Sequence, residues 1–237
     1  AFGEQYHVAR YVGTEWLTAA DFAFHHPFVS RIFVRRSVFA TLRYLDLKVT
    51  AGFAYEDWDL NCRLLAAGFD FVVAAQTVLF YRHRVGSLLQ QANATSARTI
   101  PHGTLFVPDT YRKKMNEAHE RVGDFPAFLA ARRQFFGRSF AQELLASERM
   151  INDVIEASIL DPEFEPARIE SASSYCPIPY DDNHWGFQLE RFYRVLGSQQ
   201  FDDVVLLPWL KPGGAEKYIL QVLHQLRGTG SAEQILV

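Results

Sequence analysis

Two adjacent carboxylates, Glu56 and Asp57, open a predicted helix directly after a loop. The N–H groups at the start of a helix can bind one of these side chains while the other faces a cleft. A carboxylate in a cleft can take the proton of a sugar hydroxyl and so act as a general base. The alternative is that both acids only cap the helix and complement its dipole, and the local pattern by itself favours this alternative.

Arg82 and His83 form a second candidate site, after a predicted strand and before a glycine. An imidazole can ligate a metal ion, and a guanidinium or imidazolium group can stabilise a departing diphosphate. A lone histidine is more often a structural residue, and the sequence does not say which of the two residues would act. Arg35 could also reach a phosphate, although an exposed position at a strand end explains it equally well. His25 and His26 lack a cysteine or acidic neighbour at zinc-ligand spacing, so no zinc site is expected there.

These candidate residues must be positioned by one helix and the extended segments around it. Residues 56–68 are the clearest helix of the chain, because acids occupy the first turn, Leu60 and Leu64 share one face, and a glycine ends the pattern. Polar and apolar types alternate over residues 30–36 and predict a strand, which a short helix follows. Residues 69–80 are rich in β-branched and aromatic types and predict one or two further strands.

The middle of the chain, residues 91–200, is predicted to be mainly helical. A helical pattern follows Asp124, with Pro126 in the tolerated first turn. The pattern fades around Ser147, so one long helix and two shorter helices are equally expected. A proline-rich loop is predicted over residues 162–182.

Three short segments of the first 90 residues occur in an order that is typical of one enzyme family. They read Phe33-Val34-Arg35-Arg36-Ser37, Tyr55-Glu56-Asp57-Trp58-Asp59-Leu60 and Tyr81-Arg82-His83. Over residues 28–88 this order resembles the acceptor half of the family 2 glycosyltransferases, which have the GT-A fold. The resemblance implies an inverting transfer of a sugar from a nucleotide-sugar donor to a glycan acceptor.

The resemblance also implies roles for individual residues. The catalytic base of the family maps onto Asp57, with Glu56 helping to hold the acceptor or the base. The implied substrate-binding residues are Trp58, Arg35, Arg82 and His83. Of these, His83 is also the candidate metal ligand.

One departure from the family concerns the metal. GT-A enzymes hold a divalent ion, Mg or Mn, through an Asp-x-Asp motif that ends a strand in the nucleotide-binding half. The segment Asp57-Trp58-Asp59 matches the motif in sequence, but it begins a predicted helix and does not end a strand. The chain contains no other Asp-x-Asp. The nucleotide-binding half is therefore expected to lie before Ala1, and this chain alone is expected to bind donor and metal weakly.

A second resemblance covers the last 35 residues. A continuous apolar run over residues 203–210 predicts a buried strand, with a glycine loop, a helix over residues 218–226 and a second strand after it. This run resembles the opening of family 4 glycosyltransferases, which have the GT-B fold. The resemblance makes Gly213 and Gly214 candidate substrate-binding residues, since glycine lets a backbone approach a ligand closely. A plain tight turn explains the two glycines equally well.

Composition excludes several other functions. With 49% hydrophobic residues, the 237-residue chain can bury a core, and its net charge of −3 with dispersed Lys and Arg argues against nucleic-acid binding. The sequence contains no run of about 18 apolar residues, so no membrane span is predicted. Short basic runs at residues 112–114 and 132–133 are explained by a solvated helix face or by contact with an anionic membrane. Two cysteines make no disulfide framework, so a cytoplasmic location is expected, with possible attachment at the inner face of the membrane.

Together these patterns predict an α/β chain in three parts. Residues 1–90 are expected to form the acceptor side of a GT-A domain, residues 91–200 a helical connector, and residues 201–237 the first β-loop-α of a Rossmann-like GT-B domain. The predicted function is sugar transfer in the synthesis of a polysaccharide or cell-envelope glycan. The alternative is a non-catalytic linker or docking module between transferase domains. An open cleft that Asp57 shares with Arg82 and His83 would favour the enzyme, and a carboxylate buried among caps and ion pairs would favour the module.

Overall fold

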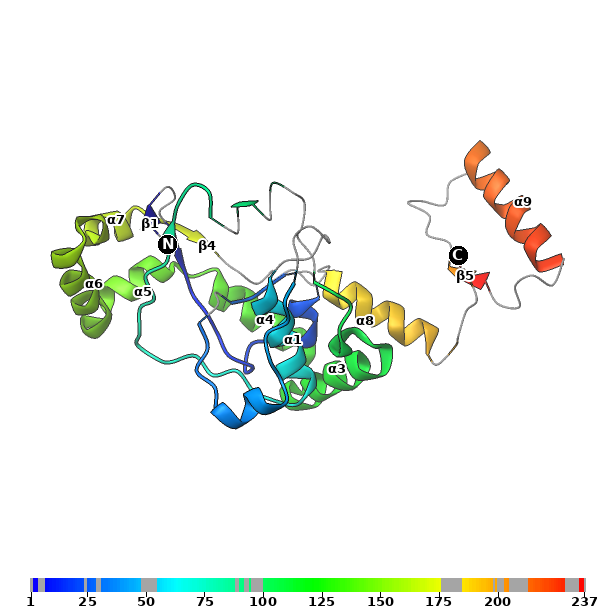
Figure 1. Ribbon diagram of the computed structural model, residues 1–237, viewed down its shortest axis with the longest axis horizontal. Helices are drawn as coiled ribbons and strands as arrows, with labels where there is room; N and C mark the ends of the chain where they lie inside the picture. Colours follow the sequence, from blue (N-terminus) through cyan, green and yellow to red (C-terminus); the bar gives the residue numbers. More distant parts are fainter. Residues whose placement is uncertain are drawn as a thin grey trace. The chain divides into compact units, whose positions relative to one another are not determined.

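The computed structural model describes residues 2–3, 7–23, 25–28, 31–47, 55–87, 90–91, 94, 100–175, 185–197, 199, 203–204, 213–228 and 235–236. They belong to two compact units, Ala1–Tyr193 and Arg194–Val237. The helices that begin in the first unit are α1 (Glu56–Ala66), α3 (Pro108–Val122), α4 (Phe125–Phe136), α5 (Phe140–Ala146), α6 (Glu148–Leu160), α7 (Pro166–Glu170) and α8 (Trp185–Leu196) (Figure 1). Shorter 3-10 helices are η1 (Ala19–Phe22), η2 (Arg36–Ala40), η4 (Thr104–Phe106) and η5 (Pro162–Phe164).

Strands are few and short in the described part of the first unit. β1 (Phe2–Gly3) pairs in parallel with β3 (Arg82–His83), and β2 (His7–Ala9) pairs in parallel with β4 (Ser173–Tyr175). Each ladder holds only two strands of two or three residues, and the architecture is mostly helical. The prediction of an α/β fold, with the acceptor half of a GT-A domain at residues 1–90, is therefore wrong.

The predicted strand segments explain this error. Residues 69–80 are irregular, with a turn at Ala75 and Gln76, and only Arg82 and His83, beyond their end, belong to a described ladder. Their apolar side chains do not share a buried face, since Val72 is 88% exposed and Leu79 is 47% exposed. Residues 31–35 are likewise unpaired before the short helix η2 begins. β-type residues favour a strand only where a neighbouring strand can satisfy the backbone and cover a face.

Helix α1 is the element that the sequence predicted best. It begins at Glu56, as expected, and its acidic first turn lies at the positive end of the helix dipole. Leu60 and Leu64 are buried, and Arg63 pairs with Asp59 one turn earlier, with 2.7 Å between Nη2 and Oδ2. Gly68 follows the helix with a left-handed φ of 89°, which favours glycine.

The helical pattern after Asp124 is divided into three helices, α4, α5 and α6, where one or two were expected. The Asp124 side chain caps α4 by accepting from the Ala127 N–H at 2.9 Å. The Ser147 side chain caps α6, at the residue where the sequence signal fades. The additional break falls at Gly137 between α4 and α5, where the low helix propensity of glycine is the physical reason.

Two apolar clusters organise the first unit. The larger one joins η1 to α1, α3 and α8 through buried residues such as Phe22, Trp58, Tyr111 and Phe187. The smaller one joins β2 to α5, α6 and α7. Figure 1 shows the same grouping, with α5, α6 and α7 together at one end of this unit.

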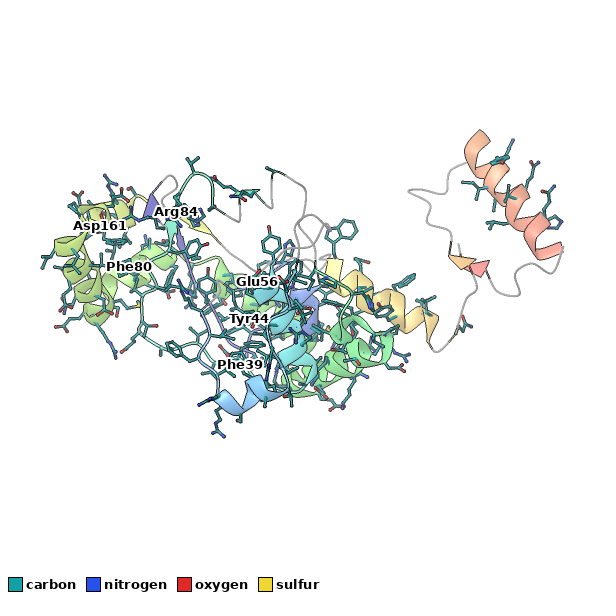
Figure 2. The ribbon with its side chains drawn as sticks, in the orientation of Figure 1. Phe39, Tyr44, Glu56, Phe80, Arg84 and Asp161 are labelled. Atoms are coloured by element: carbon teal, nitrogen blue, oxygen red, sulfur yellow. The ribbon has the colours of Figure 1, made fainter. Side chains whose placement is uncertain are left out.

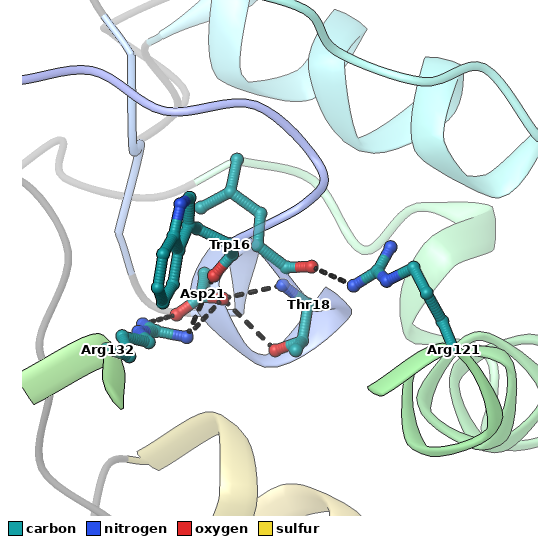
Figure 3. Close-up of polar contacts among 6 residues, drawn as sticks. Trp16, Thr18, Asp21, Arg121 and Arg132 are labelled. Carbon is teal, nitrogen blue, oxygen red and sulfur yellow. Dashed lines mark hydrogen bonds and ion pairs between the residues drawn. The ribbon is translucent and has the colours of Figure 1, made fainter. Parts of the chain in front are cut away.

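A buried polar cluster fixes η1 to the helices around it. The Arg132 guanidinium on α4 binds the Asp21 carboxylate through both terminal nitrogens, and Asp21 also accepts from the Thr18 N–H at 2.7 Å (Figure 3). On the other side, Arg121 of α3 donates to the Leu17 carbonyl at 2.8 Å. The loop that leads into η1 is thus held from two helices.

Helix α8 packs closely on this core. The Tyr111 hydroxyl donates to the Gly186 carbonyl at 2.8 Å. A Cβ added at Gly186 would lie 2.1 Å from the Ala20 carbonyl oxygen, so only glycine permits this approach. The Glu190 carboxylate lies 2.9 Å from His119 Nε2 on α3.

In the described residues of the second unit, β5 (Asp203–Val204) pairs in parallel with β6 (Ile235–Leu236), and α9 covers Gly214–Gly228. The predicted helix over residues 218–226 thus begins four residues earlier. The predicted strand over residues 203–210 is described only at Asp203–Val204. A two-residue ladder is not a Rossmann-like sheet, so the GT-B part of the fold prediction is wrong as well.

Candidate functional site

Asp57 lies in the first turn of α1 and is mostly buried, with 15% of its side chain exposed. Burial raises the pKa of this carboxyl, and the Trp58 backbone N–H, which donates to Oδ1 at 2.9 Å, opposes the shift only in part. A carboxylate whose charged form is destabilised is a stronger proton acceptor than an exposed one. The preceding residue, Tyr55, has a left-handed φ of 67°, a strained conformation for an aromatic residue that is typical of functional sites.

The His26 ring lies beside this carboxylate. Its Nδ1 lies 3.5 Å from Asp57 Oδ2, which is long for a hydrogen bond. Its Nε2 lies 2.9 Å from Asn61 Nδ2. Burial lowers the pKa of His26 to about 3, so the ring is neutral at physiological pH and the contact is not an ion pair. An amide nitrogen can only donate, so this contact assigns Nε2 as the acceptor and leaves the ring proton on Nδ1.

Tyr44 and Glu56 border the same site on its outer side. Burial raises the pKa of the Tyr44 phenol, and the charges of Asp57 and Glu56 raise it further, which requires these groups to be close. Figure 2 shows Tyr44 and Glu56 in the same part of the first unit, near α1. Both side chains are exposed, so this side of Asp57 is the one a polar ligand can reach.

The structure does not bring Arg82 and His83 to Asp57. Arg82 forms an ion pair with Asp161, and the His83 ring packs 5.4 Å from the rings of His7 and Tyr81. In Figure 2, Asp161 lies at the end of the first unit that holds α6 and α7, whereas Glu56 lies nearer the middle of the unit, on α1. The expected cleft shared by Asp57, Arg82 and His83 is therefore not formed.

The other predicted residues lie as follows. Trp58 is buried in the core, and its indole N–H donates to the Phe22 carbonyl at 2.9 Å. Arg35 is exposed at the start of η2 and makes no side-chain contact with Asp57 among the described residues. In the second unit, Gly214 opens α9, and a Cβ there would meet no described atom within 4 Å. Gly213 precedes it, and the loop before Gly213 lies outside the described residues.

No group of three or more His, Cys, Asp or Glu side chains within the described residues could hold a metal ion. His83 therefore belongs to no such group there, and the described residues do not fit the Mg or Mn site implied by the resemblance.

A cavity of about 1020 Å³ opens elsewhere in the first unit. Residues 69–80 form one wall, and the opposite walls come from β2, α5 and the segment at residues 31–34. Its lining is mostly apolar, and neither Asp57 nor His83 takes part in it.

Sequence reasoning missed His26 and Asn61. Both His25 and His26 were considered only as zinc ligands, and the contacts of His26 with α1 span 31 and 35 residues, which no local pattern reveals. Position Asn61 carries one weak signal, since a polar residue on the apolar side of an amphipathic helix needs a hydrogen-bond partner.

No family model, no curated protein and no solved structure matches this chain. Among the residues that the structure places, no helix combines the length and apolar character needed to cross a bilayer.

Proposed function

We propose that this chain acts in glycosyl transfer, with Asp57 as the general base that activates the acceptor hydroxyl. The observation that carries the proposal is the buried Asp57 carboxylate with its raised pKa, beside the neutral ring of His26. The sequence resemblance over residues 28–88 supplies the substrate class. The proposal does not depend on the GT-A fold.

The step can be written with the residues at hand. An acceptor hydroxyl placed against Asp57 Oδ2 gives its proton to this oxygen as its own oxygen attacks the anomeric carbon of the donor sugar. The bond to the nucleoside diphosphate breaks on the opposite face, so the configuration inverts and the diphosphate leaves with the electron pair. The neutral His26 ring lines the site beside the carboxylate, and Glu56 and Tyr44 offer polar contacts for the acceptor.

The donor side is not assigned to residues of this chain. A divalent ion would neutralise the diphosphate, but the described residues offer no ligand set for one, and no step is derived through it. We place the activity in the cytoplasm, at the inner face of the membrane, where nucleotide-sugars and a growing envelope glycan meet.

The second candidate function, a non-catalytic docking module, is supported by a different observation. Arg82 pairs with Asp161, His83 packs on His7 and Tyr81, and Asp57 does not line the apolar cavity. By the criterion of a shared cleft, this arrangement favours a module.

One experiment separates the two functions. Release of nucleoside diphosphate in the presence of an acceptor oligosaccharide is measured with a panel of uridine and guanosine diphosphate sugars, using the full natural protein. Asp57→Asn is expected to lower turnover by about 10²-fold or more, because the general base is lost. Asp109→Asn, at an exposed carboxylate on α3, is the matched control and should leave turnover unchanged. Equal turnover in the wild type and Asp57→Asn would refute the assignment and leave the module.

A further inference from the structure

The segment at residues 31–45 presents basic and apolar side chains together to solvent. Arg31, Arg35 and Arg36 are exposed, and Phe33 between them is fully exposed, at 104% of its reference area. Tyr44 and Leu45, near the end of the segment, are 46% and 45% exposed. A fully exposed phenylalanine flanked by arginines indicates a surface that is covered by something else in its working state.

The charge of this segment is one-sided. Every charged residue from Arg31 to Arg43 is an arginine, and the first acid is Asp46, whereas the whole chain carries a net charge of −3. Within the described residues, Arg31, Arg35 and Arg36 form no side-chain hydrogen bond or ion pair. The segment is therefore a local positive surface on an acidic protein.

The two basic runs that the sequence suggested for membrane contact differ in this respect. On α3, Arg112 pairs with Asp109 at 2.6 Å, and Lys114 pairs with Glu117 at 2.9 Å. On α4, Arg132 is completely buried against Asp21. Three of the five cations in these runs are therefore compensated within the fold, which makes the runs poorer sites for anionic lipids.

The basic segment continues into an apolar surface. Residues 31–34 line the mouth of the cavity of about 1020 Å³, opposite residues 69–80. Val72 and Leu79 on that wall are 88% and 47% exposed. Apolar side chains beside a rim of arginines match the two layers of a bilayer interface, acyl chains below and phosphates above.

We propose that residues 31–36 bind the surface of an anionic bilayer. Phe33 enters the interface between headgroups and acyl chains, and Arg31, Arg35 and Arg36 contact lipid phosphates. A bilayer is favoured over a nucleic acid because aliphatic side chains adjoin Phe33, and because the acidic remainder of the protein repels a polyanion in solution. The proposal is independent of sugar transfer at Asp57.

The test is co-sedimentation of the full chain with vesicles of phosphatidylcholine alone and vesicles that also contain phosphatidylglycerol. Binding is expected only to the anionic vesicles and should weaken as salt is added. The variant Arg31→Glu/Arg35→Glu/Arg36→Glu should bind on the order of a hundredfold more weakly, at about fivefold per arginine removed. Phe33→Ser should weaken binding about tenfold, through the lost apolar contact.

The matched control is Arg138→Glu/Arg149→Glu/Arg168→Glu, which makes the same change in net charge at exposed arginines of the first unit. It should bind vesicles nearly as well as the wild type. If both triple variants lost vesicle binding equally, net charge would explain the effect and the site would be overturned. Binding of the wild type to vesicles of pure phosphatidylcholine would overturn it as well. Full binding by Phe33→Ser, or tighter binding to a single-stranded oligonucleotide than to anionic vesicles, would also overturn it.

Discussion

Arg132 and Asp21 form a bidentate ion pair in which neither side chain has any exposed surface. Arg132 Nη1 donates to Oδ2 at 3.0 Å, and Nη2 donates to Oδ1 (Figure 3). The pair joins α4 to η1 across 111 residues of sequence. Because each charge is removed from water, each depends on the other for compensation.

Removing one partner of this pair is expected to be costly. Arg132→Met or Asp21→Leu alone should lower the free energy of unfolding by about 3–5 kcal/mol, since the remaining charge is buried without compensation. The double variant should lose less than the sum of the two. Urea denaturation of the four proteins measures this coupling. Arg133→Ala, at the exposed neighbouring position, should change stability by less than about 0.5 kcal/mol; additive losses in the double variant would contradict the coupling.

His26 is expected to govern stability in acid. Its pKa falls from 6.5 to about 3 on folding. Between these two pH values His26 is protonated in the unfolded chain but neutral in the folded chain. The free energy of unfolding is therefore unaffected by His26 above pH 6.5, and it decreases as the pH falls from 6.5 toward 3. The slope is about 1.4 kcal/mol per pH unit, and the total is on the order of 5 kcal/mol.

The measurement is the free energy of unfolding against pH for the wild type, His26→Asn and His102→Asn. His26→Asn should flatten the acid limb by about one proton, although its packing loss lowers the whole curve. His102 is exposed, so its variant should follow the wild type. An unchanged slope in His26→Asn would show that the ring is not held neutral.

Asp57→Asn is expected to stabilise the fold at neutral pH. The pKa of Asp57 is raised on folding, so its contribution to stability is full below the ordinary carboxyl pKa and is lost as the pH rises through the folded-state value. The amide carries no charge to desolvate. The melting temperature of Asp57→Asn should therefore exceed that of the wild type at pH 7, and the difference should shrink in acid. A variant less stable than the wild type at pH 7 would contradict the raised pKa.

Gly186→Ala is expected to loosen α8. The new methyl group would lie 2.1 Å from the Ala20 carbonyl oxygen, which forces a backbone shift that costs about 1–3 kcal/mol. Thermal unfolding measures the loss. The matched control is Gly103→Ala, where the nearest atom would be 3.9 Å away; similar losses in both variants would mean that helix or loop propensity, and not the close approach, sets the cost.

The parts of this fold that the sequence predicted are those that depend on near neighbours. Helix α1 carries its own start, apolar face and stop within residues 56–68, so its prediction is confirmed. Residues 69–80 could not be predicted in the same way, because β-type side chains form a strand only beside another strand. The contact of His26 with Asp57 follows from tertiary packing. Arg82 and His83 illustrate the opposite failure, since an order of motifs suggested proximity that the fold does not provide.

The lack of a strand over residues 69–80 also affects the rate of amide hydrogen exchange in this segment. Phe71 accepts a backbone bond from the Thr14 N–H at 2.9 Å, but the amides of residues 72–80 find no backbone acceptor in the described part of the chain. They should exchange with deuterated solvent within seconds, while the amides of α1 remain protected. Any molecule that covers the apolar cavity beside them would therefore be recorded directly as slowed exchange in this one stretch.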